Sequence, residues 1–319
     1  MAKDIFNFVH SNENVKLEKL SEKDLNEFIR LLDLFLLEYR EELCLPIYVT
    51  FGTEIEFIPF DYKKFRRDFY SVNFKLVNET TKEGMLEAIS PIMRDKKEKW
   101  TELKDVVDYI KARGVSNMDT GGHIHFGSHI LKNEDKITNF FKLWCAFEKV
   151  IYRFGYGEYL SARNNILKHS KPLAFLKRDL AFSDFETIKK ELLDKTYGFT
   201  LYAFDGSYFS NNNTIEIRCP NGTLEEAIWQ NNINFFARLL LYASSASFDE
   251  EFINNRLKNF ETRHPYISTF DEIYFEDAIL LCDLIFDKAI DKIYFLKQYL
   301  KNFETISQSQ SKASTFVLK

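Results

Sequence analysis

Two histidines stand two residues apart in a glycine-flanked stretch, Gly-Gly-His-Ile-His-Phe-Gly, in a chain that has only six histidines. Residues two apart on a β-strand point to the same face of the sheet. His123 and His125 can therefore reach one site, while Ile124 between them enters the core on the opposite face. Because imidazole is a common metal ligand and exchanges protons near neutral pH, the stretch predicts a strand with a functional face.

Two further stretches repeat this alternation with other chemical groups. Glu54 and Glu56 flank one isoleucine, and Glu216 and Arg218 flank another. Each polar pair predicts a strand that turns its isoleucine into the core. Three such strands side by side would form a sheet face rich in carboxylate, imidazole and guanidinium groups. We expect this face to be the active site.

A further carboxylate comes from a short apolar run, Met-Leu-Glu-Ala-Ile-Ser, that ends at a proline. The run is predicted as a strand, but its period leaves open whether Glu87 shares a face with Ile89 or lies at a turn. Glu54 and Glu56, taken alone, are also compatible with exposed strand positions, because glutamates lie mostly at protein surfaces. The arginine of the third strand is equally compatible with a simple ion pair to the glutamate beside it.

Carboxylates, an imidazole and an arginine on one face suit metal-assisted phosphoryl transfer. Mg²⁺ prefers oxygen ligands and is usually held by carboxylates together with substrate phosphates, so these glutamates could hold two ions. Mn²⁺ accepts a histidine ligand more readily than Mg²⁺ does. Arg218 suits a phosphate, or the charge that develops during its transfer. The sequence contains neither a Gly-x-x-x-x-Gly-Lys-Ser/Thr loop nor a Gly-x-Gly-x-x-Gly run, which argues against nucleotide-binding folds of those two kinds.

The elements that must position these strands follow from the spacing of apolar residues. A capping serine, Ser21, and apolar residues at helical spacing predict a first helix that runs to about Cys44. Residues 61–74 have no clear period, and residues 247–304 are expected to contain two or three helices. The other predicted elements are strands at 47–58 and 85–90 and helices at 96–113, 133–152, 185–193 and 224–246.

The chain is expected to form one α+β domain with helical additions at both ends. It contains no internal repeat and no Gly/Ser-rich linker that would separate two domains. Residues 1–46 are expected to form an N-terminal helical extension, and residues 47–246 the domain that carries the site. Residues 247–319 are expected to form a C-terminal helical region packed on that domain.

Composition and charge narrow the class of protein. The formal net charge of -5 argues against nucleic-acid binding, which needs a net basic face. The four cysteines form no Cys-x-x-Cys pair, so we expect a reducing compartment and neither a disulfide framework nor a structural zinc site. The N-terminus lacks a secretory signal pattern, and no apolar stretch is long enough to span a bilayer. We therefore expect a cytoplasmic protein with no membrane partner.

Four motifs follow one another along the chain: Gly-Thr-Glu-Ile-Glu at 52–56, Gly-Met-Leu-Glu-Ala-Ile-Ser-Pro at 84–91, Gly-Gly-His-Ile-His at 121–125 and Ile-Glu-Ile-Arg at 215–218. Each motif alone is weakly specific. In this order and spacing they resemble the amidoligase family, which belongs to the superfamily of carboxylate–amine ligases that includes glutamine synthetase and glutamate–cysteine ligase. The resemblance covers about residues 48–245.

The resemblance implies an antiparallel sheet folded into a cupped, partly open barrel of the glutamine synthetase type. Helices would lie outside it, and ATP and two or more Mg²⁺ or Mn²⁺ ions inside. The implied metal ligands are Glu54, Glu56, Glu87, His123 and Glu216. The implied ATP contacts are His125 and Arg218, and the implied catalytic residues are Arg218 and Arg163, the latter in a Ser-Ala-Arg-Asn stretch. Members of the family often carry an Asp-x-Ser segment before the second motif, where this chain has Asn-Glu-Thr-Thr, so the role of that aspartate is not carried over.

The implied function is an ATP- and metal-dependent ligase that forms an amide or isopeptide bond through an acyl phosphate. Two alternatives stay open: a metal-dependent hydrolase that uses the same ligands, and a non-catalytic ATP-binding or scaffold protein with the same fold. The partners would be small-molecule or peptide amine and carboxylate substrates, whose identity the resemblance does not fix. The oligomeric state is equally open.

Overall fold

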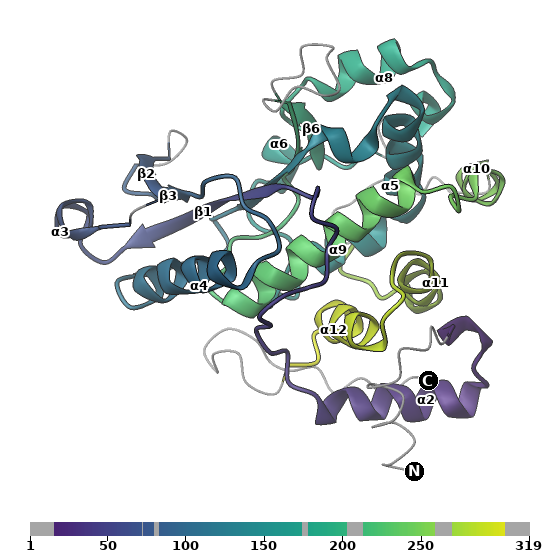
Figure 1. The fold of residues 1–319 in the computed structure, drawn as a ribbon, viewed down its shortest axis with the longest axis horizontal. Coiled ribbons are helices and arrows are strands. Elements are labelled where there is room, and N and C mark those ends of the chain that lie inside the picture. Colours follow the sequence, from purple (N-terminus) through teal and green to yellow (C-terminus); the bar gives the residue numbers. More distant parts are fainter. Residues whose placement is uncertain are drawn as a thin grey trace.

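An antiparallel sheet with helices packed against it makes up the computed structural model (Figure 1), which describes residues 16–71, 73–79, 83–173, 178–202, 213–258 and 270–303. Six strands follow one another across the sheet in the order β2 (Lys75–Asn78), β3 (Leu86–Ile89), β1 (Phe51–Pro59), β5 (Gly122–Gly127), β7 (Thr214–Ile217) and β6 (Phe199–Tyr202). A further strand, β4 (Gly114–Val115), pairs with the end of β1.

All of these strand pairs are antiparallel. The sheet is open within the described residues, because its outer strands β2 and β6 do not pair with each other. The expected class, mixed helices with an antiparallel sheet, is therefore confirmed. The described part of the sheet is not closed into a barrel.

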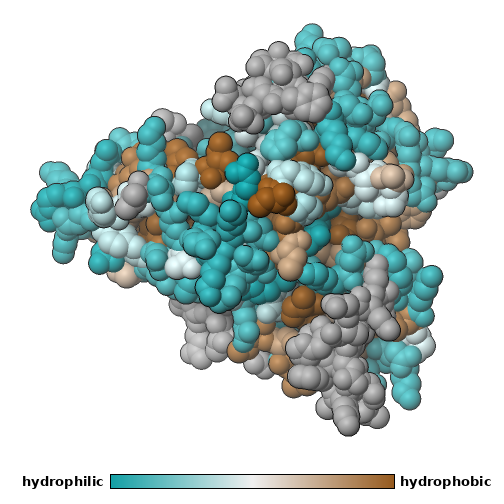
Figure 2. Space-filling view, viewed as in Figure 1, coloured by the Kyte–Doolittle hydropathy of each residue, from teal (hydrophilic) through white to brown (hydrophobic). Residues whose placement is uncertain are grey.

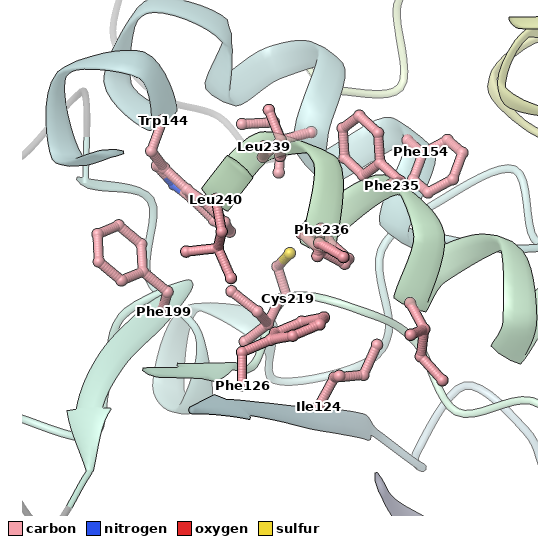
Figure 3. Packing of buried hydrophobic residues seen from close by; sticks show 14 of the residues in the cluster. Ile124, Phe126, Trp144, Phe154, Phe199, Cys219, Phe235, Phe236, Leu239 and Leu240 are labelled. Carbon is pink, nitrogen blue, oxygen red and sulfur yellow. The ribbon is translucent and has the colours of Figure 1, made fainter. Parts of the chain in front are cut away.

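One face of the sheet is closed by apolar side chains. Ile55, Ile124 and Ile217, which interrupt the three polar pairs, are each 0% exposed. Figure 3 shows Ile124 and Phe126 pointing from β5 toward helix α9 (Glu226–Ser244). Fully burying one isoleucine contributes about 1.5–3 kcal/mol, so this apolar alternation fixes which face of each strand is left for polar residues.

The two longest helices, α5 (Glu134–Gly155) and α9, form the layer beneath this apolar face. Both are buried on most sides, as expected for helices in a core. The Asn133 side chain accepts a hydrogen bond from the backbone N–H of Lys136 and caps α5, and non-helical backbone at Phe147 marks a kink. The amphipathic helix α4 (Lys97–Lys111) packs on α9. All three helices were predicted to within a few residues.

Smaller helices surround this layer. In Figure 1, α11 and α12 lie beside α9 with α2 next to them, whereas α6 and α8 lie near β6. The expectation of two or three helices in residues 247–304 is confirmed. The remaining α-helices are α2 (Glu22–Leu31), α3 (Tyr62–Asp68), α6 (Ile166–His169), α8 (Phe185–Leu192), α10 (Glu250–Lys258), α11 (Phe275–Ile285) and α12 (Ala289–Leu300). The 3-10 helices are η1 (Leu17–Lys19), η2 (Leu32–Leu34), η3 (Ser128–Leu131) and η4 (Arg178–Phe182).

The prediction that the first helix runs to about Cys44 is wrong. Helix α2 ends at Leu31, and after η2 the chain contains no further helix before β1. Distant side chains hold this non-helical segment. The backbone N–H groups of Leu43 and Leu45 donate to the Asp95 carboxylate at 2.8 and 2.7 Å, and that of Arg40 donates to a side chain of α9. These long-range bonds outweigh the local helical spacing.

Other predicted boundaries shift by a few residues. The first long strand begins at Phe51, not at residue 47, and Gly114, the residue after the helix predicted at 96–113, lies in β4. No helix in the described ranges combines the length and the apolar character needed to cross a bilayer. Figure 2 shows hydrophilic residues over the outer faces of α4 and α8.

Candidate functional site

Cross-strand pairing sets the polar residues of four strands in rows on one face of the sheet. In β1, Glu56 lies opposite Glu87 of β3, and Glu54 lies opposite His123 of β5. His125 of β5 lies opposite Glu216 of β7. Directly opposed residues of an antiparallel pair point to the same face. The register also shows that Glu87 shares its face with Ile89, the point that the period had left open.

The imidazoles lie among the carboxylates. His123 Nδ1 is 3.1 Å from Glu54 Oε2 and 3.7 Å from Glu216 Oε1, and its Nε2 is 3.8 Å from Glu56 Oε1. His125 Nε2 is 3.0 Å from Glu54 Oε1. Glu56 and Glu216 are buried, so neither is an ordinary exposed strand residue.

These side chains form three overlapping groups whose candidate ligand atoms lie within 4.8 Å of one another. The groups are Glu54 with Glu87 and His123, Glu54 with His125 and Glu216, and Glu56 with Glu79 and Glu87. The Nε2 atoms of both histidines are buried and make no hydrogen bond within the described residues. Such orphaned imidazole nitrogens beside carboxylate oxygens are a donor set that fits divalent metal ions.

Glu79 is a site residue that the sequence did not reveal as one. It follows β2, and its backbone N–H continues the ladder by donating to the carbonyl of Met85 at 3.2 Å. This pairing brings its carboxylate to Glu56 and Glu87. In the sequence, the Asn-Glu-Thr-Thr stretch that contains Glu79 stood out only because it lacks an aspartate that amidoligases often carry. The sequence did not show that β2 pairs with β3, and this pairing is what places Glu79 in the cluster.

The cluster holds more negative charge than it can compensate itself. Burial, followed by the charges of Glu54, Glu56 and Glu79, raises the pKa of Glu87 to about 9. Burial alone would also raise the pKa of Glu54, but its hydrogen bond with His123 and its close contact with His125 hold that pKa well below its usual range. Glu87 thus keeps its proton at neutral pH, because burial and the neighbouring carboxylates penalise its ionised form. A bound cation would remove that penalty.

Two arginines border the cluster. The Arg218 side chain donates to Glu216, the ion pair that its spacing allowed, and its Nε donates to the His169 carbonyl at 3.1 Å. Arg163 is buried, donates through Nη2 to the Arg218 carbonyl at 3.1 Å, and has no hydrogen-bond partner for Nε among the described residues. Burial lowers the pKa of Arg163. A Cβ at Gly121 would lie 2.5 Å from Arg163 Nη1, so a larger residue there would displace the guanidinium.

The cluster and the arginines open into a cleft of about 600 Å³, which we call the charged cleft. A second cleft of about 660 Å³ is lined by more apolar groups, and we call it the mixed cleft. The two clefts share Glu54 and Tyr202. The charged cleft is also lined by Glu56, Glu79, Glu87, Asp119, His123, Arg163, Asn164, Asn165, Lys168, His169, Lys195, Glu216 and Arg218.

The mixed cleft lies over the less charged end of the same sheet face. Gly52, opposite His125, and Gly127, opposite Thr214, leave its floor without large side chains. Its walls include Tyr48 and Ile92, two apolar residues with 46% and 66% exposure. The sheet face therefore changes from carboxylates under one cleft to glycines and threonine under the other.

Every predicted site residue lies in this region. The charged cleft contains Glu54, Glu56, Glu87, His123, Arg163, Glu216 and Arg218, and the mixed cleft contains His125. Sequence reasoning missed Glu79, Asp119, Lys168, Lys195 and Tyr202. Comparison of the chain with models of known protein families gave no match, and a search among curated proteins found none either.

Proposed function

We propose that the protein is an ATP- and divalent-metal-dependent carboxylate–amine ligase with a glutamine synthetase-like catalytic fold, which forms an amide or isopeptide bond through an acyl phosphate. One observation carries the proposal: five glutamates and His123 share a cleft with two arginines, and His125 lines the adjoining cleft. Carboxylates that hold metal ions, next to guanidinium groups that bind phosphate, are what a phosphoryl-transfer site requires.

The metal ligands would be Glu54, Glu56, Glu87, His123 and Glu216, with Glu79 added by the structure. Bound Mg²⁺ or Mn²⁺ ions would neutralise phosphate charge and polarise the transferred group. Arg218, close to Glu216, would bind a phosphate oxygen, and His125 another. Arg163 would hold the substrate carboxylate or the transferred phosphoryl group, because an unpaired buried guanidinium is stabilised by an anion.

Two clefts that meet at Glu54 suit a reaction with a nucleotide and two other substrates. The apolar walls of the mixed cleft suit the base of ATP, whose phosphates would then reach the metal ligands. The charged cleft would take the carboxylate substrate and the amine. This division keeps the reacting groups over the carboxylate-rich rows of the sheet.

Two steps would make up the reaction. An oxygen of the substrate carboxylate attacks the γ-phosphorus of ATP, the bond from that phosphorus to the bridging oxygen breaks, and ADP leaves. The amine nitrogen then attacks the carbonyl carbon of the acyl phosphate, the carbon–oxygen bond to phosphate breaks, and inorganic phosphate leaves. A carboxylate of the cluster accepts the proton that the nitrogen loses.

A thermal unfolding scan with ATP and with Mg²⁺ or Mn²⁺, singly and together, tests this proposal. A ligand that binds only the folded state stabilises it by about 2.7 kcal/mol at a hundredfold excess over its Kd. A midpoint increase that needs both ATP and metal is expected. An increase with metal alone would favour the hydrolase, and no increase with either would remove the nucleotide–metal site. ADP release with no amine or carboxylate dependence would also contradict a ligase.

A variant pair makes the test specific. Glu216→Gln should abolish the ATP- and metal-dependent increase, because it removes a buried ligand oxygen. Glu186→Gln, at an exposed position of helix α8, is the matched control and should respond like the unchanged protein. Retention of the full response by Glu216→Gln would exclude Glu216 as a ligand.

A further inference from the structure

Arg163 lies in the connection between α5 and α6, outside any helix or strand. Its backbone is nevertheless held, by one side chain from the segment that follows β7. The backbone N–H of Arg163 donates to Oδ1 of Asn221 at 2.9 Å, and Nδ2 of the same side chain donates to the Ser161 carbonyl at 3.0 Å. One side-chain amide thus bonds two backbone groups of the connection, as a neighbouring strand would do.

Asn221 is itself fixed in place. It is 2% exposed, and its backbone N–H donates to the carbonyl of Gly155, the last residue of α5, at 2.9 Å. Its backbone also forms an antiparallel bridge with Gly121, just before β5. A buried amide is penalised when it loses a hydrogen-bond partner, so the two side-chain bonds favour a single orientation.

Gly121 connects this arrangement to the proposed metal ligands. Its backbone N–H donates to Glu56 Oε2 at 2.5 Å, and His123 follows two residues later. A Cβ at Gly121 would lie 2.5 Å from Arg163 Nη1, so the bare backbone lies directly against the guanidinium. Asn221 and Gly121 together set the position of Arg163 relative to the carboxylate cluster.

The guanidinium of Arg163 has a donor that no protein group uses. The side chain is 5% exposed, and its Nε has no hydrogen-bond partner in the part of the chain that the structure describes. Its Nη2 donates to the Arg218 carbonyl at 3.1 Å. Because the donors of a guanidinium form a rigid fork, the position of the Arg163 backbone determines where Nε points.

We propose, on the basis of the ligase function above, that Asn221 is a positioning residue, which holds Arg163 so that its Nε faces the reacting groups beside the metal ligands. Asn221 is not among the residues that line either cleft. It therefore acts through Arg163 and not by contact with a substrate. A displacement of about 1 Å at a reacting centre can reduce a rate about hundredfold, so loss of this one amide should be costly for turnover.

Nuclear magnetic resonance of the arginine Nε–H groups in the full chain tests the position of Arg163 without any substrate. The signal that disappears in Arg163→Lys assigns this residue. Asn221→Ala should shift or broaden the Arg163 signal, because the backbone N–H loses its acceptor. An Arg163 signal that stays in place in Asn221→Ala would overturn the inference.

The matched control removes another buried amide, far from the cleft residues in the fold. Asn232 of α9 is 1% exposed, and its Oδ1 accepts from Gln298 Nε2 at 2.7 Å. Asn232→Ala should leave the Arg163 signal where it is. A shift of the same size in this control would assign the effect to general loosening of the core and would also overturn the inference.

The unchanged protein supplies a second measurement, which decides the case if Asn221→Ala does not fold. The backbone amide of Arg163 should exchange its hydrogen at least about a hundredfold more slowly than in an unstructured chain, because its bond to Asn221 is buried. Exchange at the rate of an unstructured chain would contradict the proposed anchoring.

The rate of ADP release separates a positioning role from a merely structural one. Asn221→Ala should reduce kcat about 10- to 100-fold. In an Arg163→Met background the same change should alter kcat by less than about twofold, because residues that act through each other are not additive. Equal factors in the two backgrounds would overturn the positioning role. If the unchanged protein releases no ADP, the ligase proposal fails, whereas the resonance and exchange measurements still decide whether Asn221 positions Arg163.

Discussion

Two groups of buried charged side chains, one on helices α11 and α12 and one on the sheet, differ in how their charges are paired. On helices α11 and α12, each buried charge has a partner within the protein. Lys292 Nζ lies 2.6 Å from Asp283 Oδ1, with both side chains at most 2% exposed. Asp291 accepts from the Arg40 side chain at 2.7 Å and from Asn234 at 2.9 Å.

On the sheet, by contrast, glutamates face one another. Glu56, Glu79 and Glu87 bring their oxygens within 4.8 Å, with two imidazoles nearby that hydrogen bonds do not satisfy fully. Buried charges that are paired within the protein stabilise the contacts between its segments. Here they hold the N-terminal segment against α11 and α12. Carboxylates that face one another are stabilised by a cation from outside. The contrast supports the sheet cluster as our candidate binding site.

The strongest test of this contrast removes one member of a balanced pair. Lys292→Met should lower the free energy of unfolding by about 3–5 kcal/mol, because it leaves the Asp283 carboxylate buried without its cation. Chemical denaturation measures the change. Lys288→Met, at the exposed start of α12, is the control and should alter stability by less than about 0.5 kcal/mol. If Lys292→Met lowered the free energy of unfolding by less than about 1 kcal/mol, the Lys292–Asp283 pair would not be the stabilising pair that the comparison assumes.

Removing an ionisable group from the sheet cluster should change stability in the opposite direction. At pH 8 and without metal, Glu87→Gln should raise the free energy of unfolding by about 1–2 kcal/mol, a value reduced for partial solvent screening. The reason is that three neighbouring carboxylates and burial penalise the ionised form of Glu87. The same variant should lose most of the stabilisation by Mn²⁺. Glu83→Gln, exposed in the adjacent turn, should do neither. Destabilisation of the metal-free Glu87→Gln protein would show that the cluster is balanced after all.

The smallest effect is a dependence of stability on pH. Between the ordinary pKa of 4.5 and about 9, Glu87 keeps in the folded protein a proton that the unfolded chain releases. The free energy of unfolding of the metal-free protein should therefore fall as pH rises through this range, by about 0.5–1 kcal/mol per pH unit after screening. Glu54, whose pKa is lowered, contributes to the pH dependence of stability only in more acidic solution. Denaturation series at several pH values would measure the slope, and either saturating Mn²⁺ or Glu87→Gln should flatten it. An unchanged slope in the variant would assign it to other groups.

The strands and their polar face could be predicted because both follow from a local period of two. The isoleucines at 55, 124 and 217 are buried as expected, and the acidic and imidazole residues beside them meet on the other face. Nothing beyond the alternation and the pairing of neighbouring strands was needed.

Residues supplied by turns and loops could not be found in this way. Glu79 reaches the cluster only through the pairing of β2 with β3, and Lys195 reaches the charged cleft only because its segment lies against Lys171. The prediction extended the first helix too far for a similar reason. Hydrogen bonds to Asp95 and Asp291, at least 50 residues away in the sequence, hold that segment in a non-helical form.

The alternation along β1, β5 and β7 also limits how this protein can change over generations. A single-residue insertion or deletion within β5 would turn His123 and His125 into the core and bring Ile124 to the solvent face. The packing of the core and the chemistry of the site would be lost together. Length variation between descendants of this chain should therefore be confined to its connecting segments, while these strands diverge only by substitution.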